Sequence, residues 1–317
     1  MKLLDRRVVI VGGGPAGLSA AIELRRLGVR HVALFEREQQ AGGIPRHTNH
    51  LGFGMRDLHR MMSGPRYARA LTERAARIGV EMRLGTTVFA LDDIDADAVV
   101  LATGVRERPR SARLVPGDRP AGIFTTGSLQ QLAMAGRRVG TRAVIVGAEH
   151  VSFSAILTLA HVDCRTVAMV TPLPRHQSYG VLKVATASLR RVPVLTDAGI
   201  AEIVGRRRVE QVVLTNGRRI DCDTVVFTGD WIPDNELARR SGLEMEPNIK
   251  GPVVDAAFRT SRANVFAIGN LVHKVATADH CARDGKAVAA EIVNTFATCV
   301  SNRGPRNGAA DSIRFGA

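Results

Sequence analysis

The sequence contains few aromatic residues and few cysteines. Phe, Trp and Tyr make up 4% of the 317 residues, which argues against the aromatic surfaces on which single-stranded nucleic acids stack. The four cysteines lie far apart, and the closest pair, Cys281 and Cys299, is separated by 18 positions. This spacing excludes a CxxC redox pair, an iron–sulfur motif and a zinc motif, so the sequence predicts no metal site. Cys222 lies between two aspartates that disfavour its thiolate, and we expect free, structural thiols.

Long apolar runs are also missing. No stretch reaches the roughly 18 uninterrupted apolar residues of a transmembrane helix, so no membrane span is predicted. The basic segment Lys2–Arg7 precedes a short apolar run and imitates a signal peptide. That run is, however, the first strand of the nucleotide-binding unit described below, and its removal would destroy the unit. We therefore expect an uncleaved, cytoplasmic protein.

Acidic residues are outnumbered by basic ones. The 44 Lys and Arg exceed the 30 Asp and Glu, which gives a formal net charge of +14. The arginines form short clusters such as 206–208 and 218–219, at expected turns and helix ends rather than along one face. No nucleic-acid-binding motif accompanies them, so we interpret them as solvated surface and as counter-charge for phosphate ligands. A contact face for an acidic partner subunit is a further interpretation.

A glycine-rich turn follows the first predicted strand. Apolar residues 8–11 lead into Gly12-x-Gly14-x-x-Gly17, after which a helix begins. These glycines allow a tight turn, close approach of the backbone to a pyrophosphate, and packing of helix on strand, and the helix N-terminus offers free N–H groups. A second strand ends at Glu36, 19 residues after Gly17, where a carboxylate can hold a ribose hydroxyl. Together these features predict a dinucleotide-binding unit.

A second turn of the same type is degenerate. The strand 142–146 enters Gly147-Ala148-Glu149-His150-Val151-Ser152, in which only the first glycine is kept. Glu149 stands where the backbone should approach a pyrophosphate, and it adds bulk and negative charge there. We expect the nucleotide-binding fold to be retained, but the binding of NAD(P) at this turn is doubtful.

Strand–helix–strand units dominate the chain and predict an α/β fold with parallel sheets. The stretch 40–65 is expected to be irregular, and the polar, Pro-bearing segment 106–120 is expected to be a linker. The other expected elements are helices over 66–78, 151–159 and 279–296, and strands over 81–84, 98–101, 166–170, 224–227 and 265–268.

This order of motifs resembles the two-domain flavoproteins of the thioredoxin reductase and disulfide reductase superfamily. The resemblance covers residue 8 to about residue 296 and rests on the first glycine turn with Glu36, on Ala102-Thr103-Gly104 and on Thr260-Ser261-x-x-x-Val265-Phe266-Ala267-x-Gly269. It implies two Rossmann-like domains, the second inserted into the first. Residues 1–110 and 248–300 would form an FAD-binding domain, residues 111–247 an NAD(P)-binding-like domain, and residues 301–317 a flexible tail.

The resemblance also implies which residues contact FAD. In the superfamily an aspartate on the ribityl chain occupies the position of Asn270, whose amide can still hydrogen-bond there. The helix entered at Thr277 would direct its N-terminus at the flavin pyrimidine ring. The implied cofactor-binding residues are Gly12, Gly14, Pro15, Ala16, Gly17, Glu36, Arg37, Gly43, Ile44, Arg46, Val88, Ala102, Thr103, Gly104, Gly269, Asn270, Thr277 and Ala278.

The redox disulfide of the superfamily is missing. Counted from Gly42-Gly43, the two cysteine positions hold Pro45 and His50, so disulfide reduction through an internal cysteine pair is excluded. His50 would be the side chain nearest the reactive face of the flavin. His50 and His47 are the candidate catalytic residues, because an imidazole titrates near neutral pH and can transfer a proton. The alternative is that they only organise the loop or its contact with a partner.

A narrower resemblance rests on residues 43–54, 63–68, 116–125 and 269–273. They look like the cysteine-poor flavoprotein subunits allied to opine oxidases, hydrogen cyanide synthase and anaerobic glycerol-3-phosphate dehydrogenase complexes. This implies an FAD-dependent component of a multi-subunit amine or alcohol dehydrogenase or oxidase. It would act on a small-molecule substrate or beside a partner flavoprotein or iron–sulfur subunit, in an oligomer or hetero-complex.

Two alternatives stay open. The first is a stand-alone NAD(P)H-dependent flavin reductase of a non-thiol acceptor, in which Arg175 and His176 would hold a 2′-phosphate. The second is a non-catalytic nucleotide-binding subunit.

Overall fold

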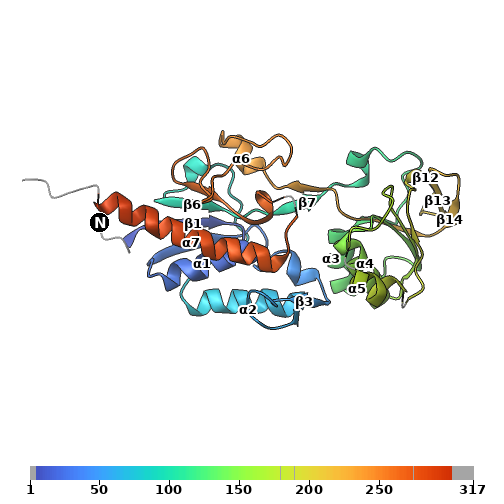
Figure 1. Cartoon of the computed structure of the whole chain (residues 1–317), viewed down its shortest axis with the longest axis horizontal. Helices are drawn as coiled ribbons and strands as arrows, with labels where there is room; N and C mark the ends of the chain where they lie inside the picture. Colours follow the sequence, from blue (N-terminus) through green and yellow to red (C-terminus); the bar gives the residue numbers. More distant parts are fainter. Residues whose placement is uncertain (1–4, 179, 189, 274, 302–317) are drawn as a thin grey trace, which may run out of the picture.

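The computed structural model describes residues 5–178, 180–188, 190–273 and 275–301. The tail predicted over 301–317 lies, apart from Ser301, outside these residues. Two five-stranded parallel sheets organise the chain, and Figure 1 shows them in two units placed side by side along the long axis. Among the described residues, no helix is both long and apolar enough to cross a membrane.

The first unit is built on a sheet with the strand order β17-β6-β1-β2-β5. Its apolar strand β1 is fully paired with β2 on one side and with β6 on the other. The strands are β1 (Arg7–Val11), β2 (His31–Phe35), β5 (Glu81–Arg83), β6 (Ala98–Leu101) and β17 (Val265–Ala267).

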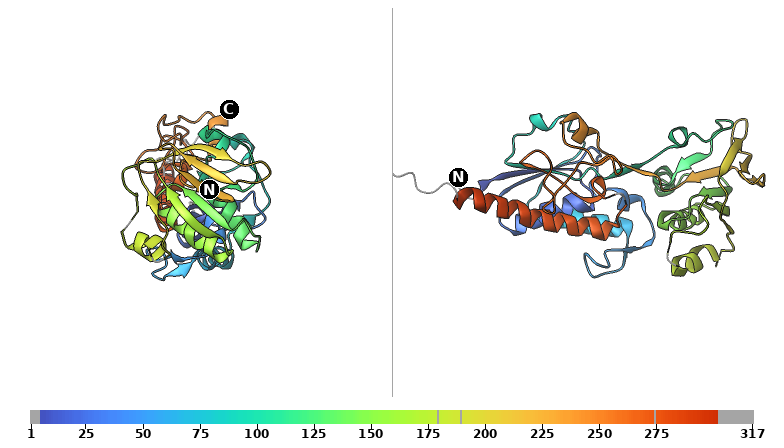
Figure 2. Two further views of the ribbon diagram at one scale, coloured as in Figure 1. Left: turned by 90° about the vertical axis from the view of Figure 1, so that its right-hand side faces the viewer. Right: turned by 45° about the horizontal axis from the view of Figure 1, so that its top comes forward.

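Three helices pack together on one face of this sheet, as Figure 1 shows. They are α1 (Pro15–Arg26), α2 (Gly64–Arg77) and α7 (Ala278–Ser301). The long helix α7 runs along α1 in Figure 1 and in the right-hand view of Figure 2. A Cβ at Gly285 of α7 would overlap the Ala16 carbonyl oxygen and lie 2.7 Å from Ala20 N, so glycine is what lets the two helices approach this closely.

The stretch 40–65 is more ordered than the sequence predicts. It contains a short 3-10 helix, η2 (Ile44–His47), and an antiparallel pair of strands, β3 (Leu51–Phe53) and β4 (Met62–Ser63). Buried side chains hold it in place: the Tyr67 hydroxyl donates to Asp57 at 3.0 Å, and Asp57 also forms an ion pair with Lys286 of α7.

The second unit has the strand order β11-β10-β9-β15-β8. Its strands are β8 (Ile123–Thr125), β9 (Arg142–Val146), β10 (Arg165–Val170), β11 (Val194–Leu195) and β15 (Thr224–Phe227). Its helices are α3 (Thr126–Met134), α4 (His150–His161), α5 (Gly180–Lys183) and the π-helix η5 (Val184–Ser188). An antiparallel sheet of β12 (Ile200–Val204), β13 (Gln211–Leu214) and β14 (Arg219–Asp221) covers it, and the sequence analysis missed this sheet.

Two chain segments connect the units. One contains the predicted linker over 106–120, and the structure has short regular elements in it. Strand β7 (Val105–Glu107) pairs antiparallel with β16 (Trp231–Pro233), which begins the return segment with α6 (Glu236–Arg240). The following 3-10 helix, η4 (Arg110–Arg113), is fixed because the buried Arg110 guanidinium donates to carbonyls of residues 115–118. These hydrogen bonds hold residues 115–118 against η4.

Candidate functional site

The first glycine turn lies where β1 meets α1. Gly12 has a φ of +111°, and a Cβ there would lie 2.7 Å from the carbonyl carbon of Ala102 in the neighbouring strand connection. A Cβ at Gly17 would overlap the Gly12 carbonyl oxygen. Gly14, by contrast, has no atom within 4 Å of its Cβ position, and it begins α1 without a side-chain cap. The N-terminal amides of α1 therefore face an open space that suits a pyrophosphate.

Glu36 and the following loop form the next wall of this space. The carboxylate of Glu36 accepts hydrogen bonds from Gly13 N at 2.8 Å and from Glu38 N at 2.9 Å. Gly42 N donates to the Gly13 carbonyl at 2.7 Å, and a Cβ at Gly43 would lie 2.9 Å from Gly14 Cα. The loop therefore lies directly against the turn, with Glu36 held where a ribose hydroxyl would meet it.

The segment after β6 lies at the same edge of the sheet. Thr103 Oγ1 donates to the Asp234 carbonyl at 2.8 Å, and Asp234 N donates to the Gly104 carbonyl at 2.9 Å. The Asp234 carboxylate pairs with Arg37 at 2.9 Å. Asp234, which was not predicted from the sequence, thus joins the returning segment to three predicted cofactor-binding positions. Val88 is partly buried and packs against the apolar cluster beneath this edge.

The last glycine motif, at Gly269, lies against the start of α1, which follows the first glycine motif. A Cβ at Gly269 would lie 2.9 Å from the Ala16 side chain, and Gly269 N donates to Asp284 Oδ2 at 3.2 Å. The Asn270 side chain donates to the Ala276 carbonyl and accepts from Ala276 N, so it holds the loop that leads into α7. Helix α7 begins at Ala278, one residue earlier than the sequence predicted.

The predicted cofactor-binding residues therefore gather at the carboxyl edge of the first sheet. This is the edge at which α/β sheets bind ligands. An open cradle at Gly14, an oriented Glu36 carboxylate and the N-termini of α1 and α7 fit an FAD molecule. Pro15, Ala16 and Thr277 lie in these helix starts, whereas Ile44 is 48% exposed and Arg46 pairs with Glu38.

The two candidate catalytic histidines lie on one loop but have different surroundings. Burial and the neighbouring Arg46 lower the pKa of His47. His50 reaches the second unit: its Nε2 lies 2.6 Å from Ser154 Oγ of α4, and its Nδ1 lies 2.8 Å from the Leu51 carbonyl. A carbonyl can only accept, so Nδ1 carries the proton and Nε2 accepts from Ser154 when the imidazole is neutral.

The degenerate turn of the second unit has Glu149 folded back over it. The Glu149 carboxylate accepts from Ala148 N at 2.9 Å, and a Cβ at Gly147 would lie 2.9 Å from both of its oxygens. Arg113 lies close enough for its charge to interact with Glu149, and it donates to the carbonyls of Thr228 and Gly229. The Glu149 carboxylate is therefore directed back onto the turn, where the Arg113 guanidinium offsets part of its charge, and not away from the N-terminus of α4.

The described cysteines offer no redox chemistry. Cys164, Cys222 and Cys281 are free and buried. Burial is the largest cause that raises the pKa of Cys164 to about 11, and the pKa values of Cys222 and Cys281 to about 12. The flanking aspartates contribute less at Cys222 than burial does, although the sequence points to them first. These thiols stay protonated near neutral pH and are structural.

A family model described as "Pyridine nucleotide-disulphide oxidoreductase" matches residues 6–285. The chain belongs to this family. It is therefore an oxidoreductase, as predicted. The thioredoxin reductase of T. acidophilum superposes with a TM-score of 0.78 at 23% identity, covering 92% of this chain and 99% of that one. This likeness confirms the predicted α/β fold with two Rossmann-like units.

Curated relatives of the chain include components of larger systems. The ferredoxin–NAD(+) reductase component of the benzene 1,2-dioxygenase system of Pseudomonas putida is 28% identical over 84% of this chain and 67% of its own length. A subunit of the opine oxidase of Agrobacterium tumefaciens (strain Ach5) is 27% identical over 83% of this chain and 60% of its own. The chain thus spans about two thirds or less of these relatives.

The doubt about NAD(P) is not supported by these comparisons. Members of the family bind FAD and NAD(P), and the Pseudomonas relative is named for NAD(+). The doubt rested on a Glu149 carboxylate extended toward a pyrophosphate, but the structure folds this carboxylate back onto Ala148 N beside Arg113. Side-chain direction cannot be read from the motif.

Proposed function

We propose that this protein is the FAD-containing component of a multi-component oxidoreductase that exchanges electrons with a separate redox protein or catalytic subunit. The main support for this proposal is that the sequence has a complete dinucleotide-binding turn, Gly12-x-Gly14-x-x-Gly17, but no redox cysteine pair. Pro45 and His50 stand at the two cysteine positions, and the described cysteines are buried. Electrons on the flavin would then pass directly to another protein or substrate.

Bound FAD would supply the hydride and electron chemistry, and the chain would bind and orient it. The amides at the start of α1 would hold the pyrophosphate, and Glu36 would hold the adenosine ribose. The first turn of α7 would place its positive dipole end toward the pyrimidine ring. The Asn270 side chain, which is hydrogen-bonded to the backbone of Ala276, would shape the loop before α7.

The second unit would take a nicotinamide nucleotide as electron donor or acceptor. The glycine pattern alone does not predict this binding. The proposal rests on the Glu149 carboxylate, which is folded back onto Ala148 N, and on relatives named as ferredoxin reductase components. The opine oxidase relatives, matched in two organisms, favour a second candidate, a component of an amine-oxidising complex.

Anaerobic rapid mixing of the FAD-loaded protein with NADH, NADPH or an amine substrate such as an opine distinguishes these candidates. Rapid reduction of the flavin by NADH alone, with no partner protein present, supports the reductase. Reduction only by the amine, in the presence of a partner protein, supports the second candidate. A protein that binds no FAD on reconstitution contradicts both.

The variant Gly14→Glu provides the structural control for FAD binding. It places a side chain and a charge in the open cradle, and we expect loss of the flavin spectrum. The matched control is Gly199→Glu in the second unit, where a Cβ would meet only the Thr215 methyl group at 3.5 Å. Retained flavin in Gly14→Glu would contradict this placement of the pyrophosphate.

A further inference from the structure

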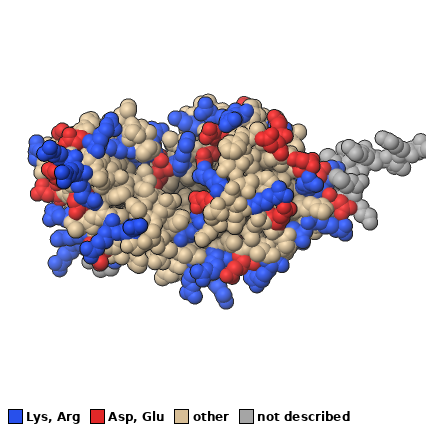
Figure 3. All heavy atoms as spheres, turned by 180° about the vertical axis from the view of Figure 1, so that it is seen from behind, with Lys and Arg blue, Asp and Glu red and all other residues tan. Residues whose placement is uncertain are grey.

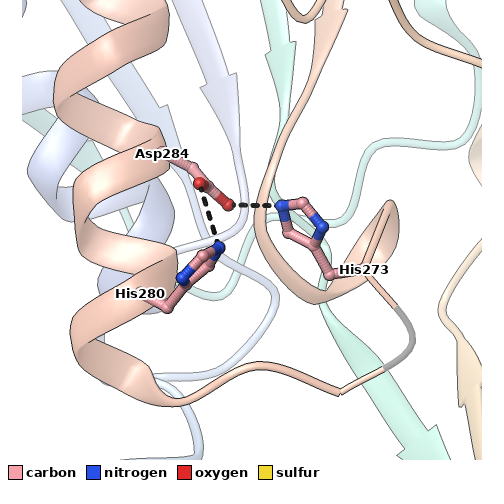
Figure 4. A group of neighbouring side chains, drawn as sticks. All are labelled: His273, His280 and Asp284. Carbon is pink, nitrogen blue, oxygen red and sulfur yellow. Dashed lines mark ion pairs between the residues drawn. The ribbon is translucent and has the colours of Figure 1, made fainter.

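Two imidazoles and one carboxylate converge beside the last glycine motif. His273 follows the short 3-10 helix η6 (Gly269–Leu271), whereas His280 and Asp284 lie one turn apart at the start of α7. Figure 4 shows both rings turned toward the Asp284 carboxylate, each facing a different oxygen. His273 Nε2 lies 3.0 Å from Oδ2, and His280 Nε2 lies 3.7 Å from Oδ1.

These distances fit a shared cation. Zinc binds His nitrogen and carboxylate oxygen at about 2.0–2.2 Å, so neighbouring donors of a tetrahedral site lie about 3.3–3.5 Å apart. The two separations, each to a different oxygen of Asp284, lie on either side of this value. One donor atom from each of the three residues can be taken so that all three lie within 4.8 Å of one another. The His280 side chain is 49% exposed, so it is the least constrained of the three by packing.

The buried nitrogen of His273 is the second observation that points to a ligand. Its Nε2 is buried, and it makes no aligned hydrogen bond to any residue that the structure describes. Its separation from Asp284 Oδ2 is short, but the two atoms do not have hydrogen-bond geometry. A buried acceptor or donor without a partner is costly, and a metal ion would use its lone pair.

Asp284 is prepared to act as a ligand. Its side chain is 10% exposed, and Oδ2 accepts the backbone N–H of Gly269, which fixes the carboxylate in one orientation. Hydrogen bonds of this kind to a ligating carboxylate orient it and tune the site. The two histidines are more exposed, so a fourth position faces solvent.

We propose that His273, His280 and Asp284 form a site for one divalent cation of the zinc type, with a coordination position open to water or an exogenous ligand. Two imidazoles and one carboxylate suit borderline metals such as Zn²⁺, Co²⁺ or Ni²⁺ better than Mg²⁺ or Ca²⁺, which prefer oxygen ligands only. The cation joins the η6 loop to α7, so its binding rigidifies the entrance to this helix.

The sequence predicts no metal site because its His and Cys residues show none of the short, regular ligand spacings of known metal motifs. His280 and Asp284 are four residues apart on one helix, but a single such pair is common on helix surfaces. The third ligand comes from a different element, and only the fold brings it to them.

Cobalt tests the site in the FAD-loaded, tag-free protein after treatment with a chelator. Titration with Co²⁺ should give one equivalent bound per chain, with the visible ligand-field bands of four- or five-coordinate cobalt, which added Zn²⁺ abolishes. His280→Ala and His273→Ala should each weaken binding by about tenfold or more. The matched control is His161→Ala, which removes an exposed histidine at the end of α4 and should leave binding unchanged.

Two further readouts keep the outcome clear. Each variant must keep the flavin spectrum and the melting temperature of the metal-free parent, because His280 is half exposed and its loss should not affect folding. Equal Co²⁺ affinity in the parent and in both histidine variants would overturn the proposal, and so would six-coordinate cobalt spectra or binding only at millimolar metal.

Discussion

At the residue scale, the Glu36 carboxylate accepts two backbone hydrogen bonds, one on each oxygen, and a glutamine side chain has only one such oxygen. One oxygen of its carboxylate accepts from Gly13 N and the other from Glu38 N. In Glu36→Gln, one of these oxygens becomes an NH₂ group that faces an N–H donor, and the charge near the ribose is lost.

We expect Glu36→Gln to weaken FAD binding by about 10- to 100-fold, as for loss of a charge-assisted hydrogen bond. Titration of the apoprotein with FAD, followed by fluorescence quenching, measures this change. Glu236→Gln at the start of α6 is the control. Unchanged affinity would show that Glu36 only holds the turn.

His50 is positioned either to transfer a proton or to connect the two units. If it transfers protons, His50→Ala should slow flavin reduction by the physiological donor by about 10²-fold. Ser154→Ala keeps the imidazole and removes its partner, so it should then retain most of the rate. Equal losses in the two variants would assign His50 to the inter-unit contact instead.

His47 makes stability depend on pH in a defined direction. Its folded pKa is lowered from 6.5 by burial and by Arg46, so the unfolded chain binds the proton more readily. Stability should therefore fall as the pH drops from about 6.5 through the lower, folded pKa. Urea unfolding at about pH 7.5 and about pH 5 should show a smaller difference in His47→Gln than in the wild type, and an equal difference would contradict the assignment.

At the element scale, the packing of α7 on α1 depends on Gly285. A glycine-to-alanine change in a helix usually stabilises by about 0.5–1 kcal/mol. Here the new methyl group would overlap the Ala16 carbonyl oxygen, and overpacking costs about 1–3 kcal/mol. Gly285→Ala should therefore lower the melting temperature, whereas Asn294→Ala, at an exposed position of α7, should not. A raised melting temperature would contradict the close approach of the helices.

How far the sequence predicts an element depends on whether its signal is local. Strand β1, its glycine turn and Glu36 are contiguous or regularly spaced, and the structure has them where the pattern placed them. The sheet β12–β13–β14 was missed because its short strands lack a clear alternation. Asp234 was not identified as a site residue because its carbonyl accepts from Thr103 Oγ1 across 131 positions of sequence. Such contacts come from topology.

At the scale of the whole molecule, two hydrogen bonds from one loop link the units. His50 contacts Ser154 at 2.6 Å, and Thr48 Oγ1 contacts Gln130 at 3.3 Å. Lys and Arg are spread in several groups among Asp and Glu on the face shown in Figure 3, so no single basic stripe dominates there. The two hydrogen bonds, from His50 and Thr48, therefore contribute to the relative orientation of the units.

We expect the double variant Gln130→Ala/Ser154→Ala to lose about 2 kcal/mol of inter-unit stabilisation, at about 1 kcal/mol per hydrogen bond. The units should then sample more orientations, which small-angle scattering would record as an increased radius of gyration. Gln131→Ala/Ser188→Ala changes exposed residues of the same types in the same unit and is the control. An unchanged scattering curve would show that other contacts set the orientation.

The pairing of β7 with β16 makes the second unit separable in principle from the first. Glu107 and Trp231 are direct partners, so the chain leaves the first unit and returns to it at adjacent points. A short hairpin turn could join these two residues and replace everything between them without moving either end. The second unit is therefore inserted into the first at one pair of adjacent strand positions, and whole units are tolerated as insertions where the two ends of the host chain lie close together.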